Sequence, residues 1–250
     1  MTFPLVFKIN THIAGTFDTI EPFATLWEGW RLKFDFLNKQ DLGFNYLVSY
    51  PFGPPQVKVV ELPVGIFVIK WLTILTNEVF MYNFQILLSF LLSGLFSFIL
   101  VQYLTKNVFA AFFSGIAYAF CPYHFVRSWQ HLGLAQIEWM PLYLFALFKL
   151  KDLRDFKNSF FVALIFFVFS ENYTYVYFMS IVSVVFMLFI FFQKHQEQKL
   201  RVFKLLAYSF LIIFLITFPS NYIVYKNLIF GPSQEVNSYY QKPFSDLFLY

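Results

Sequence analysis

The stretch from Val79 to Leu104 limits most strongly what this chain can fold into. It contains no Asp, Glu, Lys or Arg, and it is longer than the roughly 20 residues that an α-helix needs to cross a bilayer. The whole chain has the same character, because 59% of its 250 residues are hydrophobic and only 13% are charged. A soluble domain of this length could not bury so much apolar surface in one core. The sequence therefore predicts an integral membrane protein.

Apolar stretches alternate with short polar ones along the chain, which predicts an all-α, polytopic bundle of transmembrane helices. Residues 1–58 are the least apolar part and are expected to form an extracytoplasmic segment of short or interfacial helices. Within them, Thr25–Phe36 mixes apolar and charged residues at helical spacing and carries two tryptophans, as helices at a membrane interface do. Residues 59–226 are expected to form the bundle, and residues 227–250 to begin a further external segment. The bundle is expected to comprise an interfacial helix at 61–76 and spans at about 79–104, 108–121, 134–150, 158–170, 173–193 and 205–225.

Lys and Arg residues set the expected orientation of the bundle. They concentrate at Lys106 and in residues 149–157 and 194–204, whereas the loops between these carry only Arg127. Because cytoplasmic loops are enriched in Lys and Arg, the basic loops are expected in the cytoplasm. The acidic N-terminal segment and the loop at 121–138 are then expected outside a multi-pass cell-membrane protein. This distribution also argues against nucleic-acid binding, although the net charge is +4.

The two ends of the sequence suggest a piece of a longer protein. The segment expected outside the membrane has no apolar signal region before it, since Met1–Phe7 is too short. The other end stops in the apolar run Leu247–Tyr250. A helix before residue 1 is therefore expected.

An acidic pair, Asp18 and Glu21, stands in the external segment just before Pro22, which favours a helix start. Two carboxylates three residues apart can face the same way at such a start. They could supply a general base, or hold a divalent cation such as Mg²⁺ or Mn²⁺ through hard oxygen ligands. The alternative is structural: Asp18 caps the helix, and Glu21 favours its positive end.

A second polar group follows Cys121-Pro122, where the proline is expected to end a span. Arg is a natural partner for phosphate, and His or Glu at a membrane boundary could act as acid, base or ligand. The alternative is that these side chains only anchor the chain at the interface. The candidate substrate-binding residues here are His124, Arg127, His131, Gln136 and Glu138.

A third polar group separates two predicted spans at the outer boundary. It comprises Glu171, Asn172 and Tyr173. Carboxylates at a membrane boundary are rare and tend to be functional, so these residues are also candidates for substrate binding. The alternative is a short turn that faces water.

Taken in order, these segments resemble a known family. The stretch Ala117–Tyr123 (AYAFCPY) and the stretch His131–Tyr143 (HLGLAQIEWMPLY) are similar to polytopic bacterial proteins of the C-type glycosyltransferase (GT-C) superfamily. The likeness is to a group that shares an "AFSPY…HL…QW.PLYL" stretch. The acidic pair before an interfacial helix and the segment from Glu235 to Leu247 add to the resemblance.

The resemblance implies a GT-C-like fold whose first external loop carries the acidic motif, with Asp18 at the usual aspartate position. It implies sugar transfer from a polyprenyl-phosphate-linked donor to an external acceptor, a cell-envelope glycan, lipid or protein. Asp18 would activate the acceptor hydroxyl, and Arg127, His124 or His131 would hold the lipid phosphate. The acids of this chain are three apart, whereas those of the superfamily are adjacent or one apart. Glu138 stands where a neutral residue is expected.

Two other classes of function stay open from the residues alone. A transporter or flippase for lipids or oligosaccharides would use the outer polar groups as an entry site. It should carry ionisable groups near the bilayer midplane, and the span centres here are nearly free of charge. The other alternative is a catalytically inactive membrane fragment. The lipid bilayer is the one expected partner common to all three classes.

Overall fold

The computed structural model of the chain describes residues 6–15, 21–39, 71–169, 173–192 and 199–215. Every regular element within these ranges is a helix, as the sequence predicts. Further helical residues occur at 71–75 and 199–215. The labelled helices are α2 (Glu21–Leu37), α4 (Glu78–Thr105), α5 (Val108–Ala119), α6 (Pro122–Gln130), α7 (Leu132–Ala135), α8 (Trp139–Leu153), α9 (Phe156–Phe169) and α10 (Tyr173–Phe191).

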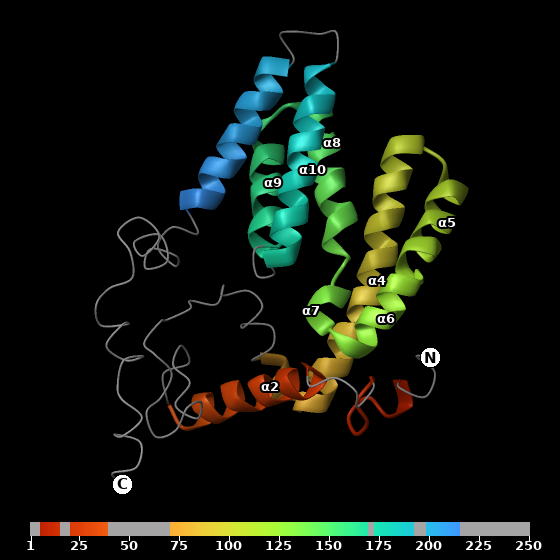
Figure 1. Cartoon of the computed structure of the whole chain (residues 1–250), viewed down its shortest axis with the longest axis vertical. Coiled ribbons are helices and arrows are strands. Elements are labelled where there is room, and N and C mark those ends of the chain that lie inside the picture. The colour runs from red at the N-terminus through yellow and green to blue at the C-terminus, as the bar shows by residue number, and fades with distance from the viewer. Residues whose placement is uncertain (1–5, 16–20, 40–70, 170–172, 193–198, 216–250) are drawn as a thin grey trace, which may run out of the picture.

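Two groups of helices stand next to each other, and α2 lies across one end (Figure 1). In the first group, α4 and α5 pack as a hairpin, and α4 also contacts α8. The second group contains α8, α9, α10 and the helix at 199–215. The short helices α6 and α7 connect the groups at the end where α2 lies. That end therefore gathers most of the polar candidates.

The turns after α4 and after α8, at the end opposite to α2, have the same backbone structure. Lys106 and Arg154 adopt left-handed backbone conformations with φ of 57° and 53°, and each donates its backbone N–H to a carbonyl of the helix that it ends. The next residue then caps the following helix: Asn107 accepts from two backbone N–H groups of α5, and Asp155 accepts from the Asn158 N–H of α9. Left-handed C-caps followed by Asn or Asp N-caps are what tight helical hairpins need.

The basic turns lie at the end of this arrangement opposite to Glu21. In Figure 1 the turn after α4, the turn after α8 and the start of the helix at 199–215 share the upper end, and these carry Lys106, Arg154 and Lys199. The first residue of α2, Glu21, lies at the lower end together with α6. The basic turns expected from the sequence thus share one end of the fold, and their orientation in the membrane stays a prediction.

Small residues allow α4 and α5 to approach closely. A Cβ added to Gly115 would lie 2.8 Å from the backbone oxygen of Gly94, so only glycine fits there. One turn further along, the hydroxyls of Ser97 and Ser114 lie 2.9 Å apart. Close packing through small residues is the usual way in which helices associate in an apolar solvent.

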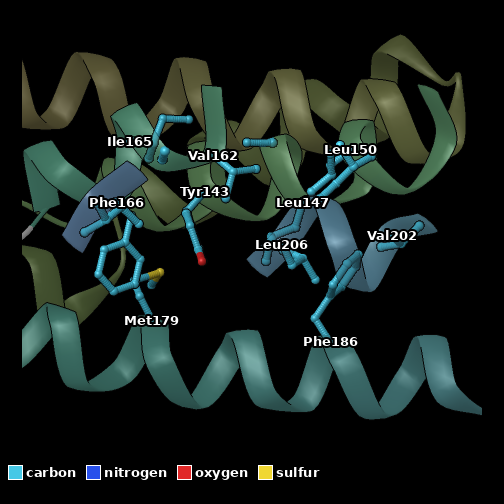
Figure 2. Close-up of a cluster of buried hydrophobic side chains, with 14 of the residues drawn as sticks. Tyr143, Leu147, Leu150, Val162, Ile165, Phe166, Met179, Phe186, Val202 and Leu206 are labelled. Carbon is cyan, nitrogen blue, oxygen red and sulfur yellow. The ribbon is translucent and has the colours of Figure 1, made fainter. Parts of the chain in front are cut away.

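A separate apolar core joins the second group of helices (Figure 2). Tyr143 and Leu147 of α8 face Val162 of α9 and Met179 of α10, and all four are almost fully buried. The helix at 199–215 closes this core with Leu206.

The outer faces of several helices are apolar and exposed. On α5 these include Phe109, Phe112 and Phe113, and α10 presents a similar row. Three helical stretches are long and apolar enough to cross a membrane: Glu78–Thr105, Val108–Gln130 and Thr174–Phe191. The apolar helix at Phe156–Val168 is shorter. Three candidate spans of this length thus occur within the described ranges, and the expected total of six stays a prediction.

Several expected boundaries differ from the structure. The stretch at 121–138, expected to be a loop, is mostly helical, because Pro122 stands at the first position of α6, where its missing N–H costs nothing. The span expected to begin at 134 begins as α8 at Trp139, after the separate turn of α7. The helix expected at 205–225 already begins by residue 199. The expected segments 61–70, 216–226 and 227–250 lie outside the described residues.

The interfacial helix expected at Thr25–Phe36 corresponds to α2, which buries charge and exposes aromatic rings. Arg31 and Asp35 are 4% and 2% exposed and form an ion pair with an N–O distance of 2.7 Å. Trp27 and Trp30 are exposed on the other face. This polarity suits a helix that lies at a membrane boundary with its aromatic side outward.

Candidate functional site

The first candidate pair joins residues that are far apart in the sequence. Glu21 begins α2, and its Oε1 lies 2.6 Å from Nδ1 of His131. His131 ends α6 by donating its backbone N–H to the Arg127 carbonyl at 2.8 Å, with an extended φ of −155°. The break between α6 and α7 therefore turns the imidazole toward α2. Both side chains are about one third exposed, so solvent reaches the pair.

Arg127, in the last turn of α6, acts on both members of this pair. Burial raises the pKa of Glu21, and the Arg127 charge lowers it in part, leaving it above its ordinary value. Burial and the Arg127 charge lower the pKa of His131, against a backbone hydrogen bond that raises it. These effects favour the neutral form of His131. In the tautomer that carries its proton on Nδ1, next to the Glu21 carboxylate, it presents a basic Nε2.

Tyr82 belongs to the same group as Glu21 and His131, but the sequence did not single it out. It is fully buried on α4, it interacts electrostatically with Glu21, and its hydroxyl has no hydrogen-bond partner among the described residues. A tyrosine inside an apolar stretch gives no sequence signal that distinguishes it from a packing residue.

The segment before Glu21 is tied to the same end of the bundle. Asn83 on α4 accepts from the Ala14 N–H at 3.0 Å and donates to the carbonyls of Ile9 and His12 at 2.8 and 2.7 Å. Gly15 has a φ of +143°, and an added Cβ would lie 2.8 Å from the carbonyl oxygen of Trp129 on α6. Residues 9–15 are thus fixed against α4 and α6.

His124 is a core residue in this structure. It is fully buried and stacked on Phe90, with ring centroids 4.0 Å apart. One ring nitrogen lies 2.9 Å from the Ser89 hydroxyl and the other lies 2.7 Å from the Ala119 carbonyl. With both nitrogens engaged, His124 has no donor or acceptor left for a phosphate. Its role in substrate binding stays a prediction that this conformation does not favour.

Gln136 and Glu138 lie in the turn between α7 and α8. Gln136 donates to Gln85 of α4 at 3.4 Å, one helical turn from Tyr82. Glu138 is 5% exposed and directly precedes α8. Burial raises the pKa of its carboxyl to about 7, although its own backbone hydrogen bond lowers it. Within the described residues, neither candidate hydrogen-bonds to Glu21 or His131.

The remaining candidates have no described side chains. Asp18, Glu171 and Asn172 lie outside the described residues, and Tyr173 is described only as the first residue of α10. Among the side chains that are described, no group of three or more His, Cys, Asp or Glu residues comes together to hold a metal ion. The divalent cation at Asp18 and Glu21 therefore stays a prediction.

A family model of a domain of unknown function (DUF6311) matches residues 22–243. The chain belongs to the DUF6311 family. The matched region of this DUF6311 protein begins directly after Glu21 and includes Arg127, His131 and Glu138. None of the curated proteins and none of the solved structures matches the chain.

Proposed function

We propose that the protein is a multi-pass membrane glycosyltransferase of the GT-C type. It would take a sugar from a polyprenyl-phosphate-linked donor and pass it to an external acceptor. The observation that carries the proposal is the contact of Glu21 with His131 beside Arg127. Residues predicted independently from two distant segments meet at the end of the bundle opposite the basic turns.

The chemistry of this group suits glycosyl transfer. The acceptor hydroxyl must lose a proton as it attacks the anomeric carbon, and the lipid phosphate must gain charge as it leaves. A neutral His131 oriented by Glu21 can accept the proton, and the Arg127 guanidinium can stabilise the phosphate. Asp18 stands three residues along the chain from both Gly15 and Glu21, each of which contacts the α6 end. It remains the candidate base that the resemblance implies.

The place of the group also supports a lipid-linked donor. Arg127 and His131 fall at and just after the end of the second candidate span, Val108–Gln130, where a lipid headgroup lies. In this proposal the basic turns face the cytoplasm, and the site faces outward. The proposed orientation predicts that a cysteine at position 21 is labelled from outside the cell and one at position 106 from inside.

The direct test is sugar transfer by the purified full chain in liposomes with a polyprenyl-phosphate sugar. We expect Glu21→Gln and His131→Gln to lower the transfer rate by roughly 100-fold or more. Arg127→Lys should keep the charge but lose the bidentate geometry, so it should also be slow. Glu78→Gln, which removes a partly exposed carboxylate at the start of α4, is the matched control.

Two further experiments test the predicted base and the predicted metal separately. Asp18→Ala tests the base, and EDTA followed by Mg²⁺ or Mn²⁺ tests the metal. Transfer at the wild-type rate by the Glu21 and His131 variants would show that this pair is not the catalytic group. Lipid movement across the bilayer without sugar transfer would favour a flippase instead.

A further inference from the structure

Glu138 is a buried carboxyl group that the proposed transfer reaction does not use. It is 5% exposed, and its Oε2 has no hydrogen-bond partner in the described part of the chain. No Lys or Arg of that part forms an ion pair with it either. A buried carboxyl oxygen without a partner costs free energy, so a fold that keeps one there needs a reason.

Two tyrosines from two helices interact with this group, and a third tyrosine interacts with both of them. Tyr118 of α5 and Tyr175 of α10 interact electrostatically with Glu138. Tyr123 of α6 is a hydrogen-bond partner of Tyr175 and interacts with Tyr118. Tyr123 is 46% exposed and so brings the cluster to the protein surface.

The cluster has more hydrogen-bond acceptors than donors. Tyr118 donates its O–H to the Ile137 carbonyl at 2.9 Å, and Tyr175 donates its O–H to the Leu134 carbonyl. A tyrosine has only one O–H to donate, so both phenol oxygens can then only accept. Once Glu138 loses its proton, its carboxylate is a further acceptor, and the cluster then has a surplus of acceptor oxygens and one negative charge.

We propose that Glu138, Tyr118, Tyr123 and Tyr175 form a binding site for a primary ammonium group. An ammonium group brings three N–H donors and the positive charge that Glu138 lacks, and tyrosine rings attract cations. This site is separate from the pair of Glu21 and His131, and it does not depend on the transferase activity. Either an amino sugar or the ethanolamine headgroup of a lipid could supply the ammonium group.

The test measures binding of glucosamine and ethanolamine to the purified full chain in detergent, by saturation-transfer NMR. N-acetylglucosamine and glucose serve as uncharged counterparts. We expect both amines to bind and Glu138→Gln to weaken them about 10- to 100-fold, as for loss of a charge-assisted hydrogen bond. Glu78→Gln should leave their affinity unchanged. Tyr123→Phe, at an exposed position, should weaken binding by a smaller factor.

The pH dependence separates an ammonium ligand from a hydroxyl ligand. The titratable groups around Glu138 are Tyr118, Tyr123, Tyr175 and Cys121, and none of these side chains carries a positive charge in either protonation state. Amine affinity should therefore rise as Glu138 loses its proton. If phosphatidylethanolamine nanodiscs raise the stability of the wild type but not of Glu138→Gln, the ammonium group comes from a lipid. Stronger binding of glucosamine than of ethanolamine would identify an amino sugar.

Three results would overturn the proposal. The first is equal binding of amines to the wild type and Glu138→Gln. The second is binding of glucose as tight as that of glucosamine. The third is the absence of amine binding at millimolar concentrations in a wild-type protein that is folded by its thermal unfolding curve.

Discussion

Replacing Glu138 by glutamine should change how the stability of the protein depends on pH. The side chain is 5% exposed, and burial raises its pKa from 4.5 to about 7. A difference of this size corresponds to roughly 3 kcal/mol between the protonated and the ionised state. Glutamine has nearly the same shape and carries no charge at any pH.

Whether stability rises or falls with pH depends on which state, folded or unfolded, binds the Glu138 proton more tightly. Below pH 4.5 the acid is protonated in the folded and the unfolded chain, so it costs nothing. Between pH 4.5 and about 7 the unfolded chain releases the proton while the folded chain keeps it, and the folded state loses stability as pH rises. The wild type should therefore lose roughly 3 kcal/mol more than Glu138→Gln between pH 4.5 and 8.

The assay is reversible unfolding in mild detergent, followed by circular dichroism at several pH values. Taking the difference between wild type and variant cancels contributions that both proteins share, such as those of Glu21 and His131. The control Glu78→Gln should follow the wild type over the whole range. Parallel curves for the wild type and Glu138→Gln would refute the argument, because they would mean that the carboxyl is hydrated or paired in solution.

Four other substitutions test how the helices pack. Gly115→Ala should lower the free energy of unfolding by roughly 1–3 kcal/mol, because its Cβ would lie 2.8 Å from the α4 backbone. Gly94→Ala should be neutral or stabilising in the same unfolding assay, because the nearest atoms to its Cβ would lie 3.5 Å away. Asn83→Ala removes three hydrogen bonds to residues 9–14 and should speed proteolytic cleavage of that segment. Equal cleavage rates in wild type and variant would show that Asn83 does not hold the segment in place. His124→Ala should cost roughly 2–4 kcal/mol while amine binding at Glu138 stays unchanged in the folded fraction.

The helices were predictable because hydropathy acts over long windows. In an apolar solvent, an uncharged stretch such as Val79–Leu104 can satisfy its backbone hydrogen bonds only as a helix. Both ends of α4 lie within one residue of these bounds. The boundaries that failed involve proline and short polar turns. Pro122 was expected to end a helix, but it stands at a position where proline also begins one, and local sequence does not distinguish the two.

The composition of the site was predictable, but its pairing was not. Glu21 and His131 were both candidates, yet their contact depends on how α2 crosses the end of the bundle, which no local pattern encodes. His124 and His131 are seven residues apart, a spacing that would put both on one face of an uninterrupted helix. Because α6 ends at Gln130, the first points into the core and the second toward α2.

The turn from His131 to Glu138 connects both proposed sites and is held by three helices. Tyr118 of α5 and Tyr175 of α10 bind its carbonyls, and Gln85 of α4 binds its Gln136. Such bracing fixes where His131 meets α2 and where Glu138 lies among the tyrosines. Since α10 belongs to one helix group and α4 and α5 to the other, any shift between the groups must pull on this turn. The two sites are therefore expected to respond to each other through the backbone of these residues, even though their side chains do not touch.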